Sequence, residues 1–368
     1  MVRLLDCRKQ GTLEDHGSAF SQIHEDPSKA DRRAMTSLRE NCAYWFLRFL
    51  QITPFRGNRN AFWTSTASRG AGSCPFPQAQ LEAENCAEFI GFFREFRPAV
   101  AGGNLLDVGS GYGGKTVAMA RELRPAKVVG VEPFESMVSK ATEYAKSVDA
   151  ANCEFRLCGQ LDIPAADGEF DAIFSHDVIE HVKDPRATLA EMYRVLKPGG
   201  NAYIVFTPYW GAFAHHLGYV SRAPFLHWLI GPRTLVAAVN RMLTGDYGKR
   251  FATAIQPPPQ RAFNGKFDVL PTLNGISSEE FLEEARWHGF VVAHARYPTI
   301  IERYRPSSRG LIWLNRALMA LHPILKEGLS FNFVCVLQKP AREQDACRSI
   351  ETAHSNATIA RQAIAESA

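Results

Sequence analysis

Short apolar runs alternate with amphipathic segments between residues 104 and 207. The runs have the length of buried strands, and the segments between them repeat apolar residues at helical spacing. Strands are therefore predicted at 104–109, 127–132, 153–158, 171–175 and 201–207, with helices between them at 114–123, 134–147 and 185–196. Such alternation predicts an α/β fold with a doubly wound, mostly parallel sheet, whose ligand crevices lie at the carboxyl ends of the strands.

The flanking sequence breaks this rhythm and divides the chain into five expected regions. They are a partly helical N-terminal extension (1–78), a cofactor-binding core (79–207), a lid rich in aromatics, histidine and proline (208–272), a C-terminal part of the sheet (273–340) and a flexible tail (341–368). Outside the core alternation, helices are predicted at 29–51, 79–96, 221–243, 277–288 and 309–325, and strands at 290–297 and 330–339.

Charge is distributed unevenly along the 368 residues, although the formal net charge is only +4. Residues 76–207 carry 13 basic and 19 acidic side chains, whereas residues 208–340 carry 15 basic and 8 acidic ones. A basic later half suits an anionic substrate or an acidic membrane surface, and equally well a merely solvated surface. No added basic module is present, so no nucleic-acid partner is expected.

The sequence also bears on the location of the protein. No apolar stretch reaches the roughly 18 residues of a membrane-spanning helix, and the N-terminus lacks the apolar core of a secretory signal. The eight cysteines form no C-x-x-C pair, which is typical of a reducing compartment. We therefore expect a cytoplasmic protein with, at most, peripheral membrane contact.

The turn after the first strand, "NLLDVGSGYGGKT", fits two glycine patterns. Gly109, Gly111 and Gly114 match the G-x-G-x-x-G of dinucleotide-binding turns. Gly109, Gly111 and Gly113 match the G-x-G-x-G turn that binds S-adenosylmethionine. The glycines alone therefore leave the ligand open.

Acidic residues at two strand ends bear on this choice. Asp107 precedes the turn, where a carboxylate would repel a pyrophosphate but would suit the ammonium group of a methionine moiety. Glu132 ends the second strand, where it can accept hydrogen bonds from the ribose hydroxyls of either cofactor. Asp107 therefore favours S-adenosylmethionine, and Glu132 supports a nucleoside without distinguishing the two.

The segment "EFDAIFSHDVIEHVKDPRATLAEMYRVLKPGGNAYIVFTP", residues 169–208, resembles the second half of class I S-adenosylmethionine-dependent methyltransferase domains. The resemblance is strongest to the branch of ubiquinone/menaquinone-type methyltransferases. It rests on Phe170-Asp171, on Glu180-His181 and on "RVLKPGG" before the fifth strand. It implies a Rossmann-like, seven-stranded methyltransferase sheet and S-adenosylmethionine as cofactor. To this sheet the pattern of the flanking sequence adds a helical N-terminal extension and a helical lid insertion.

The resemblance also implies cofactor contacts at the strand ends: Asp107 to the amino group, Glu132 to the ribose and Phe134 beside the adenine, unless Phe134 packs in the core. Many relatives have Asp where Gln160 stands, so the adenine contact falls to Gln160 or Asp162. The expected cofactor-binding residues are Asp107, Gly109, Ser110, Gly111, Gly113, Glu132, Pro133, Phe134, Gln160, Leu161, Asp162, Ser175 and His176.

Candidate catalytic residues are His215 and His216 in "TPYWGAFAHHLGY" and His181 in the Glu-His pair. A histidine there could take a proton near neutral pH. Neighbouring histidines point in different directions, so at most one of His215 and His216 faces the site; alternatively both pack within the lid. Two adjacent histidines without a third ligand make a weak zinc motif, so no metal is expected.

The sequence thus predicts methyl transfer to a small molecule, on oxygen, beneath the lid. The acceptor is expected to be anionic or lipid-like, and the N-terminal helix to cover its site or to form a homodimer. Two alternatives stay open: a non-catalytic binding or scaffold protein with this fold, and a C- or N-methyltransferase of a lipid-like substrate.

Overall fold

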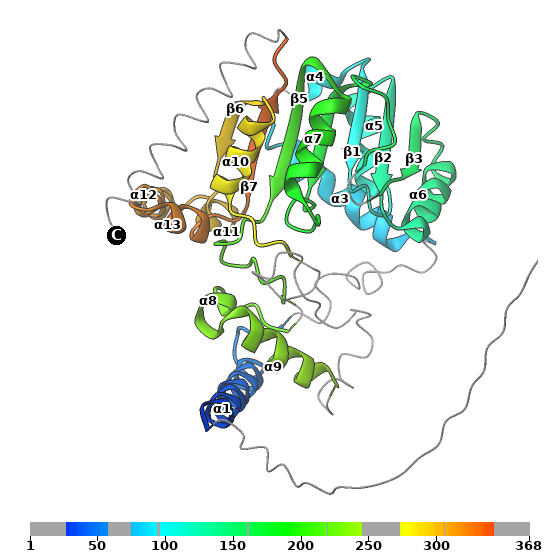
Figure 1. Ribbon diagram of the computed structural model, residues 1–368. Coiled ribbons are helices and arrows are strands. Elements are labelled where there is room, and N and C mark those ends of the chain that lie inside the picture. The colour runs from blue at the N-terminus through cyan, green and yellow to red at the C-terminus, as the bar shows by residue number, and fades with distance from the viewer. Residues whose placement is uncertain are drawn as a thin grey trace, which may run out of the picture.

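One mixed sheet forms the centre of the computed structural model, which describes residues 27–57, 75–93, 96–159, 162–218, 220–244, 273–304 and 306–341 (Figure 1). Seven strands of these residues lie in the order β3-β2-β1-β4-β5-β7-β6. The strands are β1 (Asn104–Val108), β2 (Lys127–Glu132), β3 (Cys153–Leu157), β4 (Phe170–His176), β5 (Leu196–Phe206), β6 (Val291–Arg296) and β7 (Phe333–Gln338). Only β7 runs antiparallel to its neighbours, β5 and β6, so the predicted doubly wound α/β fold is confirmed.

Helices connect the strands and extend the chain beyond the sheet. Those described are α1 (Pro27–Leu50), α3 (Pro77–Ile90), α4 (Phe96–Val100), α5 (Gly114–Leu123), α6 (Glu135–Ser147), α7 (Pro185–Val195), α8 (Leu226–Ile230), α9 (Pro232–Thr244), α10 (Ser278–Trp287), α11 (Ile300–Tyr304), α12 (Arg309–Met319) and α13 (Pro323–Gly328).

Each face of the sheet has its own apolar core, because successive strand side chains point to opposite faces. On one face Leu106 and Ile204 pack with Met192 of α7 and Phe281 of α10. On the other face a second cluster joins the strands to α3, α4 and α5. Figure 1 shows α7 and α10 over the same face of the sheet. Buried strands covered on both sides leave the strand ends as the accessible edge.

Three predicted helices are shorter or interrupted, each for a local reason. The segment 309–325 is two helices, because Pro323 begins α13 and His322 caps it with its Nδ1 atom, 3.1 Å from the backbone N of Ile324. The segment 221–243 divides at Gly231, before Pro232 begins α9. The segment 79–96 likewise ends its first helix at Ile90.

The fifth strand begins earlier than predicted. The sequence predicts a strand at 201–207, after Gly199 and Gly200, but β5 starts at Leu196 and pairs there with Phe170. The pairing register shifts between Phe170 and Ala172, so the glycines lie in an irregular stretch of strand. The backbone N of Gly199 bonds to the carbonyl of Lys339, which continues the sheet hydrogen bonding.

A separate helical unit contains α1, α8 and α9 (Figure 1). Leu47 and Leu50 of α1 pack with Val239 and Met242 of α9 in one buried cluster. Polar contacts reinforce it: the Arg241 guanidinium lies 4.3 Å from the centre of the Tyr44 ring. The N-terminal extension and the insertion after β5 therefore share a hydrophobic core. Within the described ranges, no helix is long and apolar enough to cross a membrane.

Candidate functional site

The glycine-rich turn leaves β1 at Val108 and enters α5 at Gly114. Gly109, Gly111 and Gly113 have φ angles of 75°, 56° and 82°, a region that side chains disfavour. A Cβ atom on Gly109 would also lie 2.3 Å from Cγ2 of Val178, in the loop after β4. Glycine is therefore required here both by backbone conformation and by space.

Gly114, which completes the dinucleotide pattern, has a separate structural reason. A Cβ atom at this position would lie 1.9 Å from the backbone oxygen of Ala79 in α3. Close packing of α3 against α5 thus demands a glycine whichever ligand the turn binds.

Two carboxylates flank the turn. Asp107 is fully buried, and its Oδ2 atom accepts a hydrogen bond of 2.6 Å from the Thr116 hydroxyl. Burial raises the pKa of Asp107, while the Lys115 ammonium and the Thr116 hydrogen bond oppose that rise. Glu132 Oε2 accepts a hydrogen bond of 3.1 Å from the backbone N of Gly111. Burial also raises the pKa of Glu132, so both carboxyl groups lie in a poorly solvated place.

Three buried side-chain oxygens around the strand ends have no hydrogen-bond partner among the described residues: Asp107 Oδ1, Ser110 Oγ and Ser175 Oγ. Buried polar atoms are rarely left unpaired, so such a group of atoms indicates a place where a polar ligand binds. With the bare glycine backbone and Glu132 beside it, these atoms could hold the polar groups of a cofactor.

Glu82, which the sequence analysis did not single out, lies directly on the glycine turn. Its two carboxylate oxygens accept hydrogen bonds from the backbone N of Tyr112 (3.2 Å) and of Gly114 (3.0 Å). Glu82 comes from α3, far ahead of the motif, and no pattern in the sequence marks it. Burial raises the pKa of Glu82 to about 7, against the lowering effect of Lys115 and these hydrogen bonds.

This raised pKa predicts a pH-dependent stability of the cofactor-free protein. A carboxyl group whose pKa is higher when folded than when unfolded stabilises the fold below its unfolded pKa, and that stabilisation is lost as the pH rises through about 7. Between pH 5.5 and 7.5, the wild-type free energy of unfolding should therefore fall by about 2 kcal/mol relative to that of Glu82→Gln. Urea unfolding at both pH values measures this difference.

Glu84→Gln, on the exposed part of α3, is the control, and its stability should change with pH as that of the wild type does. Parallel pH profiles of stability for wild type and Glu82→Gln would contradict the assignment.

The end of β4 carries the next polar groups. His176 is buried, and the Lys115 Nζ atom lies 3.3 Å from its Nδ1 atom and 3.2 Å from its carbonyl oxygen. Lys115 follows the glycine turn in the first turn of α5, so it links the turn to the end of β4. The sequence analysis placed His176 at the site but missed Lys115.

Glu180 and His181 lie in the loop between β4 and α7. Glu180 is 3% exposed; its Oε1 atom accepts a hydrogen bond of 3.1 Å from the backbone N of Thr207, while Oε2 has no partner among the described residues. Burial raises the pKa of Glu180 to about 7. The ring of His181 meets the ring of His216 edge to face, with 5.1 Å between ring centroids.

The two neighbouring histidines after β5 do point in different directions. Both ring nitrogens of His215 contact backbone: Nδ1 accepts from the Leu217 N at 3.0 Å, and Nε2 lies 3.1 Å from the Ala223 oxygen. Burial lowers the pKa of His215 to about 4. The structure therefore brings His216 and His181 together, and it gives His215 contacts within the turn that follows.

The other residues expected to contact the cofactor are exposed where the structure describes them. Phe134 is 61% exposed, so it is available to a ligand and does not pack in the core. Pro133 beside it and Asp162 after β3 are exposed as well. Gln160 and Leu161 lie outside the described residues.

Comparison with known proteins places this site in a family. Residues 106–204 match the family model for the methyltransferase domain. Over 238 residues the chain is 32% identical to an uncharacterized methyltransferase of Mycobacterium sp. (strain JLS), and the match covers 64% of this chain and 77% of that relative.

Two other relatives match over the core alone. An uncharacterized methyltransferase of Schizosaccharomyces pombe is 38% identical over 102 residues, 26% of this chain and 37% of its own. The demethylmenaquinone methyltransferase of Listeria welshimeri is 35% identical over 107 residues, 29% of this chain and 45% of its own. The match therefore spans less than half the length of each of these two. The Mycobacterium match extends well beyond the core, and on that evidence the chain belongs to the class I S-adenosylmethionine-dependent methyltransferases, enzymes whose cofactor is S-adenosylmethionine and not a dinucleotide.

Proposed function

We propose that this methyltransferase transfers a methyl group to an oxygen atom of a small, lipid-like acceptor, and that the glycine turn and the ends of β1, β2 and β4 hold the cofactor. Asp107 would bind the cofactor amino group and Glu132 the ribose hydroxyls. Ser110 and Ser175 would pair with its remaining polar atoms, and Phe134 would flank the adenine. When bound, the cofactor supplies an electrophilic methyl group on a sulfonium centre.

The grouping of Glu180, His181 and His216 at the ends of β4 and β5 carries the proposal of an oxygen acceptor. Methyl transfer is an in-line displacement, so the acceptor atom must be held in line with the methyl group and shielded from water. A hydroxyl acceptor must also lose its proton, which requires polar groups on the acceptor side. Glu180 and His181 follow β4, which ends at Ser175 and His176, and His216 follows β5, so we assign that task to these three side chains.

Exposed apolar side chains support a lipid-like acceptor met at a membrane surface. Trp313 is 72% exposed, and α12 presents further leucines together with Arg309 and Arg316. Apolar side chains flanked by basic ones are typical of helices that lie in a membrane interface. One relative is named a demethylmenaquinone methyltransferase. The five described cysteines are free thiols, which supports work on the reducing, cytosolic side.

The proposal is tested with the full chain, deuteromethyl-labelled S-adenosylmethionine and a prenylated hydroquinone carried in vesicles. We expect a labelled methyl ether in the product, detected by mass spectrometry and located by NMR, and faster turnover on anionic than on neutral vesicles. The matched control acceptor is the same molecule with its hydroxyls already methylated, which should stay unlabelled. Equal labelling of the blocked acceptor would show transfer to carbon and overturn the proposal of oxygen methylation.

A further inference from the structure

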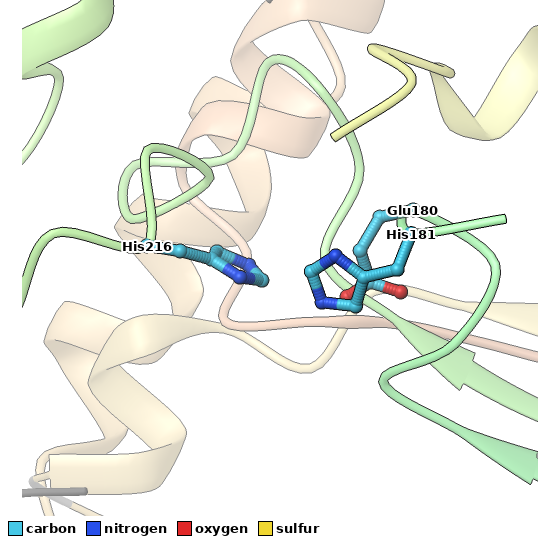
Figure 2. Close-up of side chains that lie close together, drawn as sticks. All are labelled: Glu180, His181 and His216. Atoms are coloured by element: carbon cyan, nitrogen blue, oxygen red, sulfur yellow. The ribbon is translucent and has the colours of Figure 1, made fainter. Parts of the chain in front are cut away.

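Three potential metal ligands from two separate loops meet beyond the ends of β4 and β5. Glu180 and His181 follow β4, and His216 follows β5; one ligand atom of each lies within 4.8 Å of the other two. Figure 2 shows the two imidazole rings extending toward each other from opposite sides, with the Glu180 carboxylate beside His181. The sequence analysis expected no metal because two adjacent histidines lacked a third ligand. The fold brings one of that pair together with two potential ligands from another loop.

The backbone around Glu180 is tightly fixed. The side-chain nitrogen of Asn274 donates to the carbonyls of Ile179 (2.6 Å) and Val182 (3.0 Å), and the Asn274 backbone N donates to the Glu180 carbonyl (2.8 Å). The backbone N of Thr207 donates a hydrogen bond to one carboxylate oxygen of Glu180. The other carboxylate oxygen is buried and has no partner among the described residues. A buried carboxylate oxygen left unpaired is costly, and a bound cation removes that cost.

The turn that carries His216 also has an unusual backbone conformation. His216 has a φ angle of 51°, which is uncommon for a residue with a side chain. The hydrogen bonds of His215 to Leu217 and Ala223 hold this turn in place. The neighbouring histidine thus has a positioning role, and the strained conformation directs His216 toward His181.

We propose that Glu180, His181 and His216 form a binding site for a divalent transition-metal cation of the zinc type. Two imidazole nitrogens and one carboxylate oxygen are the protein ligands of one class of catalytic zinc sites, which leave a further position open. Magnesium prefers a set made of oxygen atoms and fits this site poorly. Ligand atoms on one tetrahedral zinc ion lie about 3.4 Å apart, so zinc binding requires the present spacing of up to 4.8 Å to shorten.

The role of this site rests on the proposed oxygen methylation, whereas its existence does not. A cation held here binds the hydroxyl of the acceptor at its open position and lowers the pKa of that hydroxyl. The proton passes to water. A lone pair of the oxygen then forms the new carbon–oxygen bond as the carbon–sulfur bond breaks, and the sulfur keeps that electron pair as a neutral thioether.

The test measures metal binding without any acceptor. Full-length protein is freed of metal with a chelator and titrated with zinc chloride by competition with a chromophoric chelator, and cobalt(II) is added in parallel for its visible absorption. We expect one tight zinc ion per chain and intense cobalt bands typical of tetrahedral coordination. His216→Asn, chosen because asparagine tolerates the left-handed region, and Glu180→Gln should each weaken zinc binding about 100-fold or more. His294→Ala, on the exposed part of β6, is the matched control and should bind zinc as the wild type does.

Each variant is first shown to bind S-adenosylmethionine normally, which excludes a general folding defect. Absence of tight zinc binding by the wild type, or equal binding by His216→Asn and wild type, would overturn the site. Full methyl transfer by the metal-free enzyme would overturn its role toward the acceptor. A methylated product found on carbon would count against the proposed function and the role of the site toward a hydroxyl, but not against the site itself, because the zinc titration does not depend on the acceptor.

Discussion

Replacement of Glu132 by alanine should weaken S-adenosylmethionine binding about 100-fold. Glu132 lies at the end of β2 with little solvent access, and its carboxylate is proposed to accept hydrogen bonds from two ribose hydroxyls. Hydrogen bonds to a charged group contribute about 1.5 kcal/mol or more each, so losing two of them costs about 3 kcal/mol, or two decades of affinity. Isothermal titration of wild type and variant with the cofactor measures the change.

Two further variants separate the loss of the proposed ribose hydrogen bonds from the loss of the hydrogen bond between the Gly111 backbone N and Glu132. Glu132→Gln keeps one acceptor oxygen and should lie between alanine and wild type. Glu135→Ala removes an exposed carboxylate in the first turn of α6 and should change the affinity less than about threefold. Near-wild-type affinity of Glu132→Ala would show that the ribose lies elsewhere.

Gly109→Ala is expected to cause a large loss of stability. Its φ of 75° costs an alanine about 1–2 kcal/mol, and the new Cβ would lie 2.3 Å from Val178, which adds about 1–3 kcal/mol of overpacking. The total loss of about 2–5 kcal/mol is measured by urea unfolding, and cofactor affinity should fall with it because the turn is displaced.

Gly102→Ala isolates the backbone part of this effect. Gly102 has a similar φ of 71°, but a Cβ atom there would meet nothing within 4 Å. It should therefore cost only about 1–2 kcal/mol. In the double variant Gly109→Ala/Val178→Ala the overpacking is relieved, so the combined loss should be smaller than the sum of the single losses. Additive losses would show that Val178 does not restrict the turn.

The strands of the sheet were predictable because buried strands appear in the sequence as short runs of apolar residues. All five strands predicted in the first half are present, and the central strands β1, β2 and β4 are almost entirely buried. The edge strand β3 is only partly buried and carries Glu154 and Arg156. Helix ends were predicted less well, as at Pro323, because one capping contact can outweigh a continuous apolar pattern. The early start of β5 depends on pairing with Phe170, a contact between segments that periodicity does not encode.

The site was predictable in part for a related reason. Asp107, the glycines and Glu132 lie at strand ends, so the strand pattern locates them. Glu82 and the pairing of His181 with His216 arise where loops and a preceding helix converge in space, and neither spacing nor composition records that convergence. The assignment of roles to all of these residues stays a prediction for the measurements above.

The shared core of α1 and α9 has a consequence for synthesis on the ribosome. Gln51 at the end of α1 bonds to the carbonyl of Val220, 169 residues later in the chain. At about 5–20 residues per second, α1 leaves the ribosome roughly 10–30 s before its partner segment exists. During that interval the apolar side chains of Ala43, Leu47 and Leu50 have no native surface to cover them. Until translation has passed α9, the apolar face of α1 in the nascent chain is therefore open to non-native contacts.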